Sequence, residues 1–177
     1  FRQVSKIIGT KDYINYRLTG RILTDYSYAS GSGVYDLVNW RYSDELIAAS
    51  QISRDFFPEI VPSSEVIGQL TPEASKALGL PRGVQVVAGG VDNSCMALGA
   101  KNTRNGRVYT SLGSSAWIAV SSNKPVLDKR YKPYVFAHVI PGMYTSAVSI
   151  FSAGTTYNWV KDNLCQNLVG EAASSGE

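Results

Sequence analysis

Cysteine and histidine are scarce in this chain. Its 177 residues include two cysteines, Cys95 and Cys165, and a single histidine, His138. Two cysteines cannot form a disulfide framework, and no cluster of cysteine and histidine has the spacing of zinc ligands. The sequence therefore excludes a disulfide-rich scaffold and a zinc site, and we predict no metal-ligating residues. His138 lies in a predicted strand, where a lone histidine is usually structural, so we assign it no catalytic role.

Long apolar runs and a strong charge of either sign are also missing. The longest apolar runs, such as Val84–Ala88 and Ala116–Val120, have the length of strands, so none is predicted to cross a membrane. Seventeen Lys and Arg residues against 14 Asp and Glu give a net charge of +3, and the basic residues are scattered. Polyanion-binding proteins carry clustered basic residues, so a nucleic-acid-binding domain is a weak alternative. We expect a cytoplasmic protein without membrane or nucleic-acid partners, and the first residue, Phe1, suggests a fragment of a longer chain.

The composition is that of a globular α/β protein, with 44% hydrophobic and 18% charged residues. Helices and strands alternate in the first part, and two strand pairs lead into a helix in the second. We predict two units, residues 1–102 and residues 103–177. The predicted helices cover residues 11–18, 43–50, 72–79, 94–100 and 155–168, and the predicted strands cover residues 21–24, 84–88, 107–112, 116–121, 134–139 and 144–151. In the first helix we expect Thr10 as the N-cap, Ile14 and Leu18 on one face, and Gly20 at the C-terminal end. Ser43 and Thr71 are expected to begin the second and third helices. The predicted loops cover residues 25–33 and 56–64, and residues 170–177 are a small, polar tail that we expect to be frayed.

A strand, a glycine pair and an acidic residue form the first candidate site. The apolar run Val84–Ala88 predicts a strand buried on both faces, and Gly89-Gly90 would end it just before Asp92. Ligands of α/β proteins bind beyond the carboxyl ends of strands, and the glycines let the backbone approach a ligand closely. A carboxylate at this place can take a proton from a substrate hydroxyl. The alternative is that Asp92 only caps the following helix, and the pattern does not choose between these roles.

The turn Gly113-Ser114-Ser115 between two predicted strands is the second candidate site. Successive N–H groups and hydroxyls in such a turn can bind phosphate without a lysine, although an ordinary hairpin is the more common reading. The sequence contains neither a Walker A motif nor G-x-G-x-x-G. The third candidate is the polar loop Asp25–Gly33, whose side chains could bind sugar hydroxyls, although a capped turn is the more common role of such residues.

Several short motifs, taken in order, resemble those of the FGGY carbohydrate kinases. These motifs are Lys11-Asp12-Tyr13, Leu18-Thr19-Gly20, Thr24-Asp25, Ala29-Ser30, Gly89-Gly90-Val91-Asp92-Asn93 and Ser111-Leu112-Gly113-Ser114-Ser115. The resemblance extends from about Thr10 to Leu168, and it is the order of the motifs that makes it specific. Within the family, Asp92-Asn93 and the segment Phe136–Trp159 are most similar to the xylulose kinases, while gluconate, ribulose and glycerol kinases stay open as alternatives.

The resemblance implies part of an actin-like (ribonuclease H-like) ATPase fold, in which two α/β domains close over a cleft. Residues 1–102 would be the end of the sugar-binding N-terminal domain, and residues 103–177 the start of the nucleotide-binding C-terminal domain. The implied activity is transfer of the γ-phosphate of ATP to a sugar hydroxyl, with ATP and Mg²⁺ as cofactors and xylulose as the favoured sugar. A homodimer is one assembly that we consider.

The resemblance also implies roles for individual residues. Asp92 matches the family's general base, which lies in the sugar site, and Asn93 matches a residue that contacts the sugar in xylulose kinases. Gly113 and Ser114 match the hairpin that holds the ATP phosphates, with Ser114 replacing the usual threonine and keeping its hydroxyl. Other nucleotide-binding segments of the family have no counterpart here, so we expect the fragment alone to be inactive. A non-catalytic sugar-binding or regulatory protein with the same fold is the alternative function.

Overall fold

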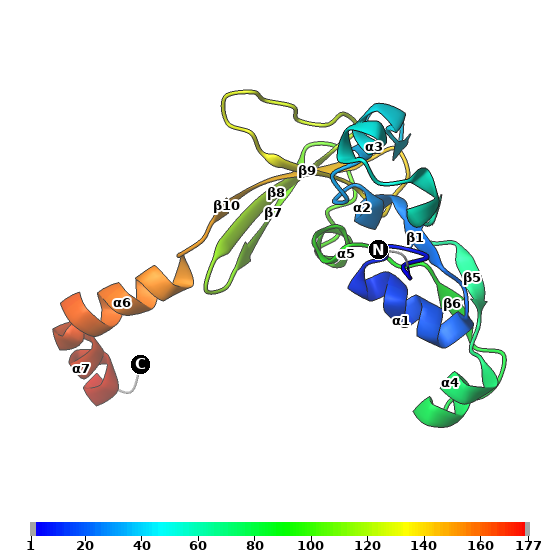
Figure 1. Ribbon diagram of the computed structural model, residues 1–177. Helices are drawn as coiled ribbons and strands as arrows, with labels where there is room; N and C mark the ends of the chain where they lie inside the picture. Colours follow the sequence, from blue (N-terminus) through cyan, green and yellow to red (C-terminus); the bar gives the residue numbers. More distant parts are fainter. Residues whose placement is uncertain (1–2, 176–177) are drawn as a thin grey trace.

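The chain forms two arms that meet beside a short central helix, α5 (Asp92–Gly99) (Figure 1). The computed structural model describes residues 3–175. None of the helices in that range is both long and apolar enough to cross a membrane. The first arm contains α1 (Thr10–Thr19), β1 (Leu23–Asp25), α2 (Tyr26–Ala29), β2 (Tyr35–Asp36), β3 (Arg41–Tyr42), α3 (Asp44–Ser50), a 3-10 turn (Arg54–Phe56), β4 (Glu59–Val61), β5 (Val66–Gln69), α4 (Pro72–Leu78) and β6 (Gln85–Val87). The second arm contains β7 (Arg107–Leu112), β8 (Ala116–Ser122), β9 (Tyr134–Ala137), β10 (Tyr144–Ile150), α6 (Gly154–Leu164) and α7 (Gln166–Ser175).

The strands of the first arm pair in twos: β1 with β4, β2 with β3, and β5 with β6. The β1–β4 pair is parallel, with Thr24 opposite Ile60. The predicted loop at residues 56–64 therefore contains a strand, β4, and the prediction is wrong there. Pro58 and Pro62 lie just outside β4, where their missing N–H groups cost no hydrogen bond of the ladder. The two prolines thus mark the ends of the short strand β4, whose pairing partner, β1, lies far away in the sequence.

Strand β6 is less buried than its apolar sequence predicts. The run at residues 84–88 predicts a strand buried on both faces, but β6 pairs only with β5, in antiparallel fashion, and Val87 is 49% exposed. Within the described residues β6 has a single strand neighbour, so its other edge stays open. Ala88, directly after β6, is nevertheless buried against Leu23 and Ile67. The loop that leads to α5 thus begins at a buried residue, Ala88.

Helix α1 buries a polar face. The sequence suggested Thr10 as its N-cap and a shared face of Ile14 and Leu18, but the N-cap is Gly9 and Ile14 is 56% exposed. The buried residues of α1 are Asp12 and Asn15 instead. Hydrophobic spacing could not reveal this face, because the helix packs polar groups against the loop after β6. Gly20, in the left-handed conformation with φ 75°, ends α1 as predicted.

Local capping signals predicted two other helices correctly. Ser43 caps α3 by accepting a hydrogen bond from the N–H of Leu46, and Thr71 caps α4 by accepting one from Ala74. The predicted loop at residues 25–33, by contrast, contains the one-turn helix α2. Asp25 caps α2 through its carboxylate, so a capped turn, which the sequence offered as one role for this segment, is what forms.

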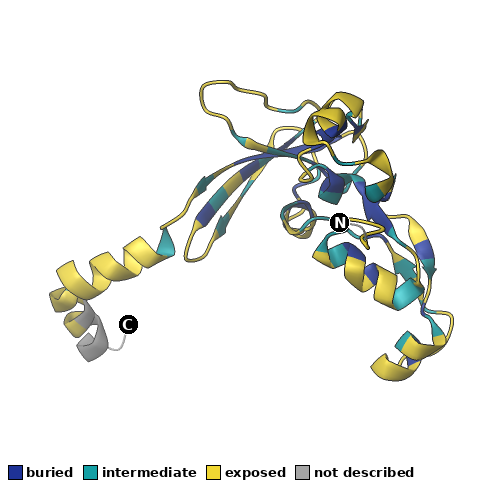
Figure 2. Cartoon of the chain, viewed as in Figure 1, coloured by how far each residue is buried: buried dark blue, intermediate teal, exposed yellow. Residues whose placement is uncertain are grey.

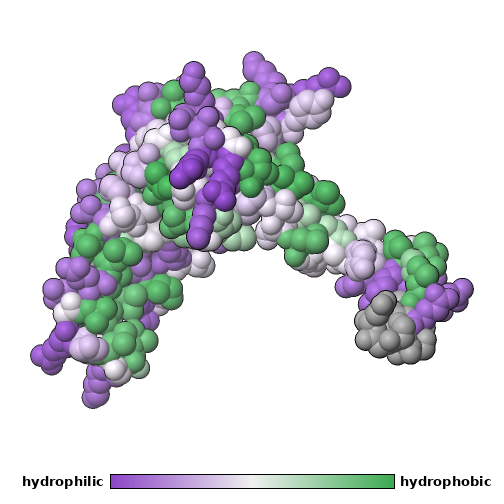
Figure 3. Space-filling view, turned by 180° about the vertical axis from the view of Figure 1, so that it is seen from behind, coloured by the Kyte–Doolittle hydropathy of each residue, from purple (hydrophilic) through white to green (hydrophobic). Residues whose placement is uncertain are grey.

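The second arm is built on one antiparallel sheet, in the order β7-β8-β10-β9. The two predicted strand pairs thus join through β8 and β10, where Ile118 lies opposite Val148. Residues that alternate along the strands share a face. On one face Val108, Ile118 and Val148 are 42–56% exposed, and apolar side chains gather there on the molecular surface (Figure 3). On the other face Tyr109 points to α5, because its hydroxyl bonds the carbonyl of Asn93.

The C-terminal helices extend away from the sheet (Figure 2). The single helix predicted for residues 155–168 is interrupted at Cys165, which ends α6 in a non-helical conformation. Residues 170–175 of the tail that the sequence predicts to be frayed belong to α7, and residues 176–177 lie outside the described chain. No residue of α6 is buried, and among the described helices α6 contacts α7, which follows it directly in the chain.

Candidate active site

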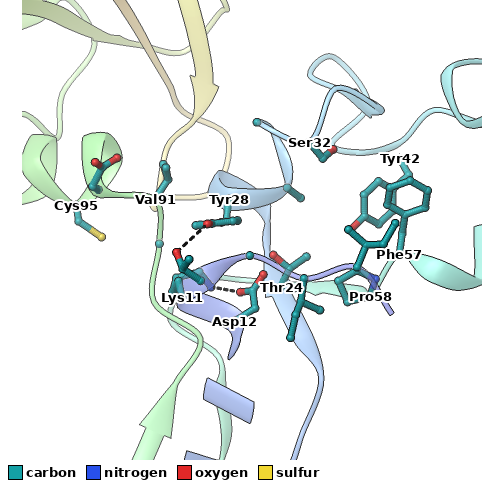
Figure 4. A pocket seen from close by; sticks show the side chains of 18 residues that line it. Lys11, Asp12, Thr24, Tyr28, Ser32, Tyr42, Phe57, Pro58, Val91 and Cys95 are labelled. Carbon is teal, nitrogen blue, oxygen red and sulfur yellow. Dashed lines mark hydrogen bonds and ion pairs between the residues drawn. The ribbon is translucent and has the colours of Figure 1, made fainter. Parts of the chain in front are cut away.

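A cavity of about 690 Å³ opens between α1, α2 and the loop before α5. Figure 4 shows Lys11, Asp12 and Tyr28 close together in its centre. Val91 and Cys95 lie on one side of these residues, and the side chains of Tyr42, Phe57 and Pro58 lie on the other. The cavity therefore joins a polar, charged half to an aromatic half. Such mixed clefts are the usual form of small-molecule sites.

Asp92 lies on the wall of this cavity and is exposed. It is the first residue of α5, and one of its carboxylate oxygens, Oδ1, accepts the N–H of Asn93 at 2.7 Å. The N-cap of α5 is Val91, so the structure does not give Asp92 the capping role that the sequence left open.

Gly89 and Gly90 allow the chain to take the path that leads to the start of α5. Gly89 has φ 69°, a left-handed conformation that favours glycine. A Cβ on Gly90 would overlap the side chain of Val139 and lie 2.9 Å from Oγ of Ser27. The chain can pass between these two groups only without a side chain. The pair is thus a point of close backbone approach, and the groups that it approaches belong to the protein, whereas the sequence predicted approach to a ligand.

A single ammonium group sits between two carboxylates in the polar half of the cavity. Nζ of Lys11 lies 2.6 Å from Oδ1 of Asp12 and 3.1 Å from Oδ1 of Asp25. It also lies 5.3 Å from the centre of the Tyr28 ring, close enough for a cation–π interaction. With Asp92 on the wall, carboxylates outnumber the ammonium group in this half. Such an environment suits a neutral, hydroxyl-rich ligand better than an anion.

The sequence gave no site role to Lys11 or Cys95, which the structure brings to the cavity, whereas Tyr28 comes from the candidate loop at residues 25–33. The spacing along the sequence does not by itself mark Lys11 as a site residue. Lys11 and Asn15 are four residues apart on α1, and both side chains donate to the carbonyl of Ala88, at 3.0 and 2.8 Å. Desolvation raises the pKa of the Cys95 thiol, which disfavours its thiolate form.

Asn93 is half-buried and does not line the cavity. Its main-chain carbonyl accepts the hydroxyl of Tyr109 at 3.1 Å, which ties the first turn of α5 to β7. Burial raises the pKa of Tyr109, and the charge of Asp92 acts in the same direction. Tyr109 thus stays a neutral hydrogen-bond donor beside the candidate base.

The turn of Gly113 and Ser114 lies at the end of β7 that is remote from α5, beside the beginning of α6 (Figure 1). Neither residue lines the cavity. The carbonyl of Ser114 accepts the N–H of Ala153 at 2.9 Å, and that of Gly113 accepts the N–H of Gly154 at 3.1 Å. A Cβ on Gly154 would overlap the Gly113 carbonyl, so only glycine fits there. The Ser114 hydroxyl, in contrast, is exposed and has no hydrogen-bond partner within residues 3–175.

No group of three or more His, Cys, Asp or Glu side chains in the described part of the chain could hold a metal ion. Of the acidic residues that line the cavity, Asp12 pairs with Lys11, and Asp92 accepts the N–H of Asn93. A divalent cation at this site would therefore depend on oxygen ligands brought by a substrate.

Comparisons with known proteins point to one family. The family model described as "FGGY family of carbohydrate kinases, N-terminal domain" matches residues 1–99. The xylulose kinase of Klebsiella pneumoniae is 33% identical over 159 residues, which are 90% of this chain and 33% of that protein. The crystal structure of xylulose kinase from Rhodospirillum rubrum matches with a TM-score of 0.85 and 32% identity, over 97% of this chain and 35% of that one. That of gluconate kinase from Lactobacillus acidophilus matches with a TM-score of 0.86 and 26% identity, over 93% and 33%. The chain thus spans about a third of the length of these proteins.

Proposed function

This chain belongs to the FGGY family of carbohydrate kinases, and from that premise we propose that the full-length gene product transfers the γ-phosphoryl group of ATP to a sugar hydroxyl. The fold is part of the actin-like ATPase fold of these kinases, of which the chain comprises about a third. The observation that carries the proposal is the exposed carboxylate of Asp92 on the wall of the cavity, beside Lys11 and Tyr28.

In the proposed reaction Asp92 is the general base. Its carboxylate takes the proton from the sugar hydroxyl, and the hydroxyl oxygen forms a bond to the γ-phosphorus of ATP. The bond from the γ-phosphorus to the bridging oxygen breaks, and ADP leaves with the electron pair. Asp92 is the first residue of α5, so its carboxylate begins the helix at the edge of the cavity. Asn93 is proposed to contact the sugar, which requires its half-buried side chain to turn toward the ligand.

The turn of Gly113 and Ser114 is proposed to bind the phosphates of ATP. Its exposed Ser114 hydroxyl is available as a donor, and its carbonyls are already bonded to the start of α6, which fixes the turn. Mg²⁺, when bound, neutralises charge on the phosphates. The chain's own contribution is to hold the donors of the turn in place. We propose that residues 1–102 belong to the sugar-binding domain and that residues 103–177 belong to the nucleotide-binding domain.

We propose xylulose as the acceptor, because the xylulose kinases of Klebsiella pneumoniae and Rhodospirillum rubrum are among the relatives at or above 32% identity. Gluconate is the second candidate, since the gluconate kinase structure matches equally well in shape. The excess of carboxylates around Lys11 favours the uncharged xylulose over the gluconate anion. We propose that the reaction takes place in the cytoplasm.

The test is the turnover of Asp92→Asn in the full-length gene product. Asparagine keeps the size of the side chain but cannot accept the proton, so we expect turnover to fall by about 10²–10⁴. The KM for xylulose should change little, because sugar contacts remain. Asp44→Asn is the matched control: Asp44 is also the exposed first residue of a helix, α3, but lies outside the cavity.

Sugar-dependent ADP release, measured with xylulose, ribulose, gluconate and glycerol, decides between the candidates. Near-normal turnover of Asp92→Asn would remove the carboxylate from the mechanism. A wild-type protein that binds a sugar but releases no ADP would instead establish the alternative of a non-catalytic sugar-binding protein.

A further inference from the structure

The loop between β6 and α5, residues 88–91, is held by hydrogen bonds from three separate segments of the first arm. The carbonyl of Ala88 accepts the side chains of Lys11 and Asn15. The N–H of Gly89 donates to the main-chain carbonyl of Ser63 at 2.9 Å. Two residues later, the N–H of Val91 donates to the hydroxyl of Ser27 at 2.9 Å.

Three of the residues that hold this loop, Lys11, Ser27 and Ser63, also contact the carboxylate of Asp25. Its Oδ1 pairs with Nζ of Lys11 at 3.1 Å. Its Oδ2 accepts the hydroxyls of Ser27 at 2.5 Å and Ser63 at 2.6 Å, and also the N–H of Ser27 at 2.9 Å. We call Lys11, Asp25, Ser27 and Ser63 the Asp25 cluster. Asp25 and Ser27 are fully buried, and a buried carboxylate is tolerated only when it is paired and hydrogen-bonded in this way.

Ser27 is the member of the cluster that reaches the base most directly. Its hydroxyl donates to Asp25 and accepts from Val91, so the charge of Asp25 polarises the bond that holds Val91. Val91 is the N-cap of α5, and Asp92 is the next residue. The close approach of Gly90 to the Ser27 hydroxyl leaves the loop little room to move.

We infer that Asp25 and Ser27 are positioning residues for Asp92, which they act on through the N–H of Val91. The inference rests on the proposed function, because it needs Asp92 to be the base. The Ser27 hydroxyl links the N–H of Val91, at the start of α5, to the fully buried carboxylate of Asp25. This link holds the first turn of α5 in place and so sets the direction in which the Asp92 side chain meets the substrate. Displacing a catalytic group by about 1 Å can cost about 10²-fold in rate.

A purely structural role for the cluster makes a different prediction, and Ser63 separates the two. Ser27 and Ser63 both donate to the same oxygen of Asp25, and both are buried. Only Ser27 touches the loop through its side chain. Ser63 holds Gly89 through its main-chain carbonyl, which the substitution Ser63→Ala retains. Both alanine variants thus remove a hydroxyl that donates to Asp25. Only Ser27→Ala also removes a hydrogen bond to residues 88–91.

The experiment compares kcat, the KM for xylulose and the thermal midpoint of Ser27→Ala and Ser63→Ala in the full-length gene product. We expect Ser27→Ala to lower kcat by about 10- to 100-fold with a nearly unchanged KM, since a base that is misplaced slows the chemical step alone. Ser63→Ala should keep kcat within about threefold of the wild type, whatever its thermal midpoint. Equal kcat values for the two folded variants would overturn the inference.

A double variant gives a readout that a loss of stability would not produce. If Ser27 acts through Asp92, then adding Ser27→Ala to Asp92→Asn should not lower the residual rate further. A further loss by the full factor of the single variant would overturn the inference. If Ser27→Ala does not fold, Ser27→Cys is judged by the same kcat criterion, because it keeps the shape and weakens the acceptor. Normal turnover of Asp92→Asn would refute the proposed base itself, whereas an inactive Asp92→Asn with equal alanine variants would refute only the positioning role.

Discussion

The indole N–H of Trp40 donates a hydrogen bond to the hydroxyl of Tyr144, at 2.7 Å and across 104 residues of sequence. The same hydroxyl donates to the carbonyl of Leu37 at 2.9 Å, and the two rings meet edge to face at 5.5 Å. Tyr144 belongs to β10 of the second arm, while Trp40 and Leu37 belong to the first. One phenol therefore ties the arms together, and it does so at a tryptophan with φ 54°, a conformation that bulky residues rarely adopt.

The first prediction is that Tyr144→Phe lowers the free energy of unfolding of the full-length gene product by about 1–3 kcal/mol. The substitution leaves the ring in place but removes the hydroxyl, so the indole N–H and the carbonyl of Leu37 both lose a partner in a partly buried place. Urea unfolding measures the change. Tyr134→Phe is the control, because Tyr134 is 48% exposed, and it should change the free energy by less than about 0.5 kcal/mol. Equal losses in the two variants would show that the hydroxyl of Tyr144 contributes no special stability.

Elements whose signals are local could be predicted from the sequence, and elements that depend on distant partners could not. The caps Ser43 and Thr71 act within three residues, so α3 and α4 were predicted at their correct ends. Strand β4 was missed because it exists only through its parallel pairing with β1, which lies 36 residues earlier in register. The burial of β6 was overestimated because an apolar run does not reveal how many strands will flank it.

The candidate site divides in the same way. Asp92 could be found because a strand, two glycines and an acid follow one another directly in the sequence, and the structure brings it to the cavity wall. The partners of Asp25 could not be found, because Lys11 and Ser63 come from segments 14 residues before it and 38 after it. No local pattern indicates that three such segments meet. The same holds for α1, whose buried face is polar and therefore invisible to a search for apolar spacing.

The second prediction concerns His138, whose side chain is buried. Its Nδ1 accepts the N–H of Ile140 at 3.0 Å, which requires this nitrogen to be unprotonated, and burial lowers the pKa of His138. In the unfolded chain the pKa of a histidine is about 6.5. As the pH falls below that value, the unfolded chain binds a proton that the folded protein does not, so the free energy of unfolding decreases. We expect the loss to begin near pH 6.5 and to continue down to the lowered pKa of the folded state.

His138→Asn isolates this contribution from that of all other groups. The asparagine Oδ1 can take the place of Nδ1 as acceptor for Ile140, but it does not titrate. The free energies of unfolding of the two proteins, measured by urea unfolding between pH 5 and pH 8, should differ by an amount that changes with pH only below about 6.5. Two parallel curves would mean that His138 is protonated equally easily in the folded and unfolded states.

The third prediction concerns the turn between β7 and β8. If the exposed hydroxyl of Ser114 donates to a phosphate oxygen of ATP, then Ser114→Ala should raise the KM for ATP and leave that for xylulose unchanged. A hydrogen bond to a charged group contributes about 1.5–3 kcal/mol, which corresponds to an increase of about 10- to 100-fold. Initial rates at saturating sugar and varied ATP measure it. Ser115→Ala is the matched control, since Ser115 is equally exposed and its main-chain carbonyl, which accepts the N–H of Gly113, is retained. An equal rise in both variants would mean that any change in the turn weakens ATP binding, and a rise in the KM for xylulose would place Ser114 outside the nucleotide site.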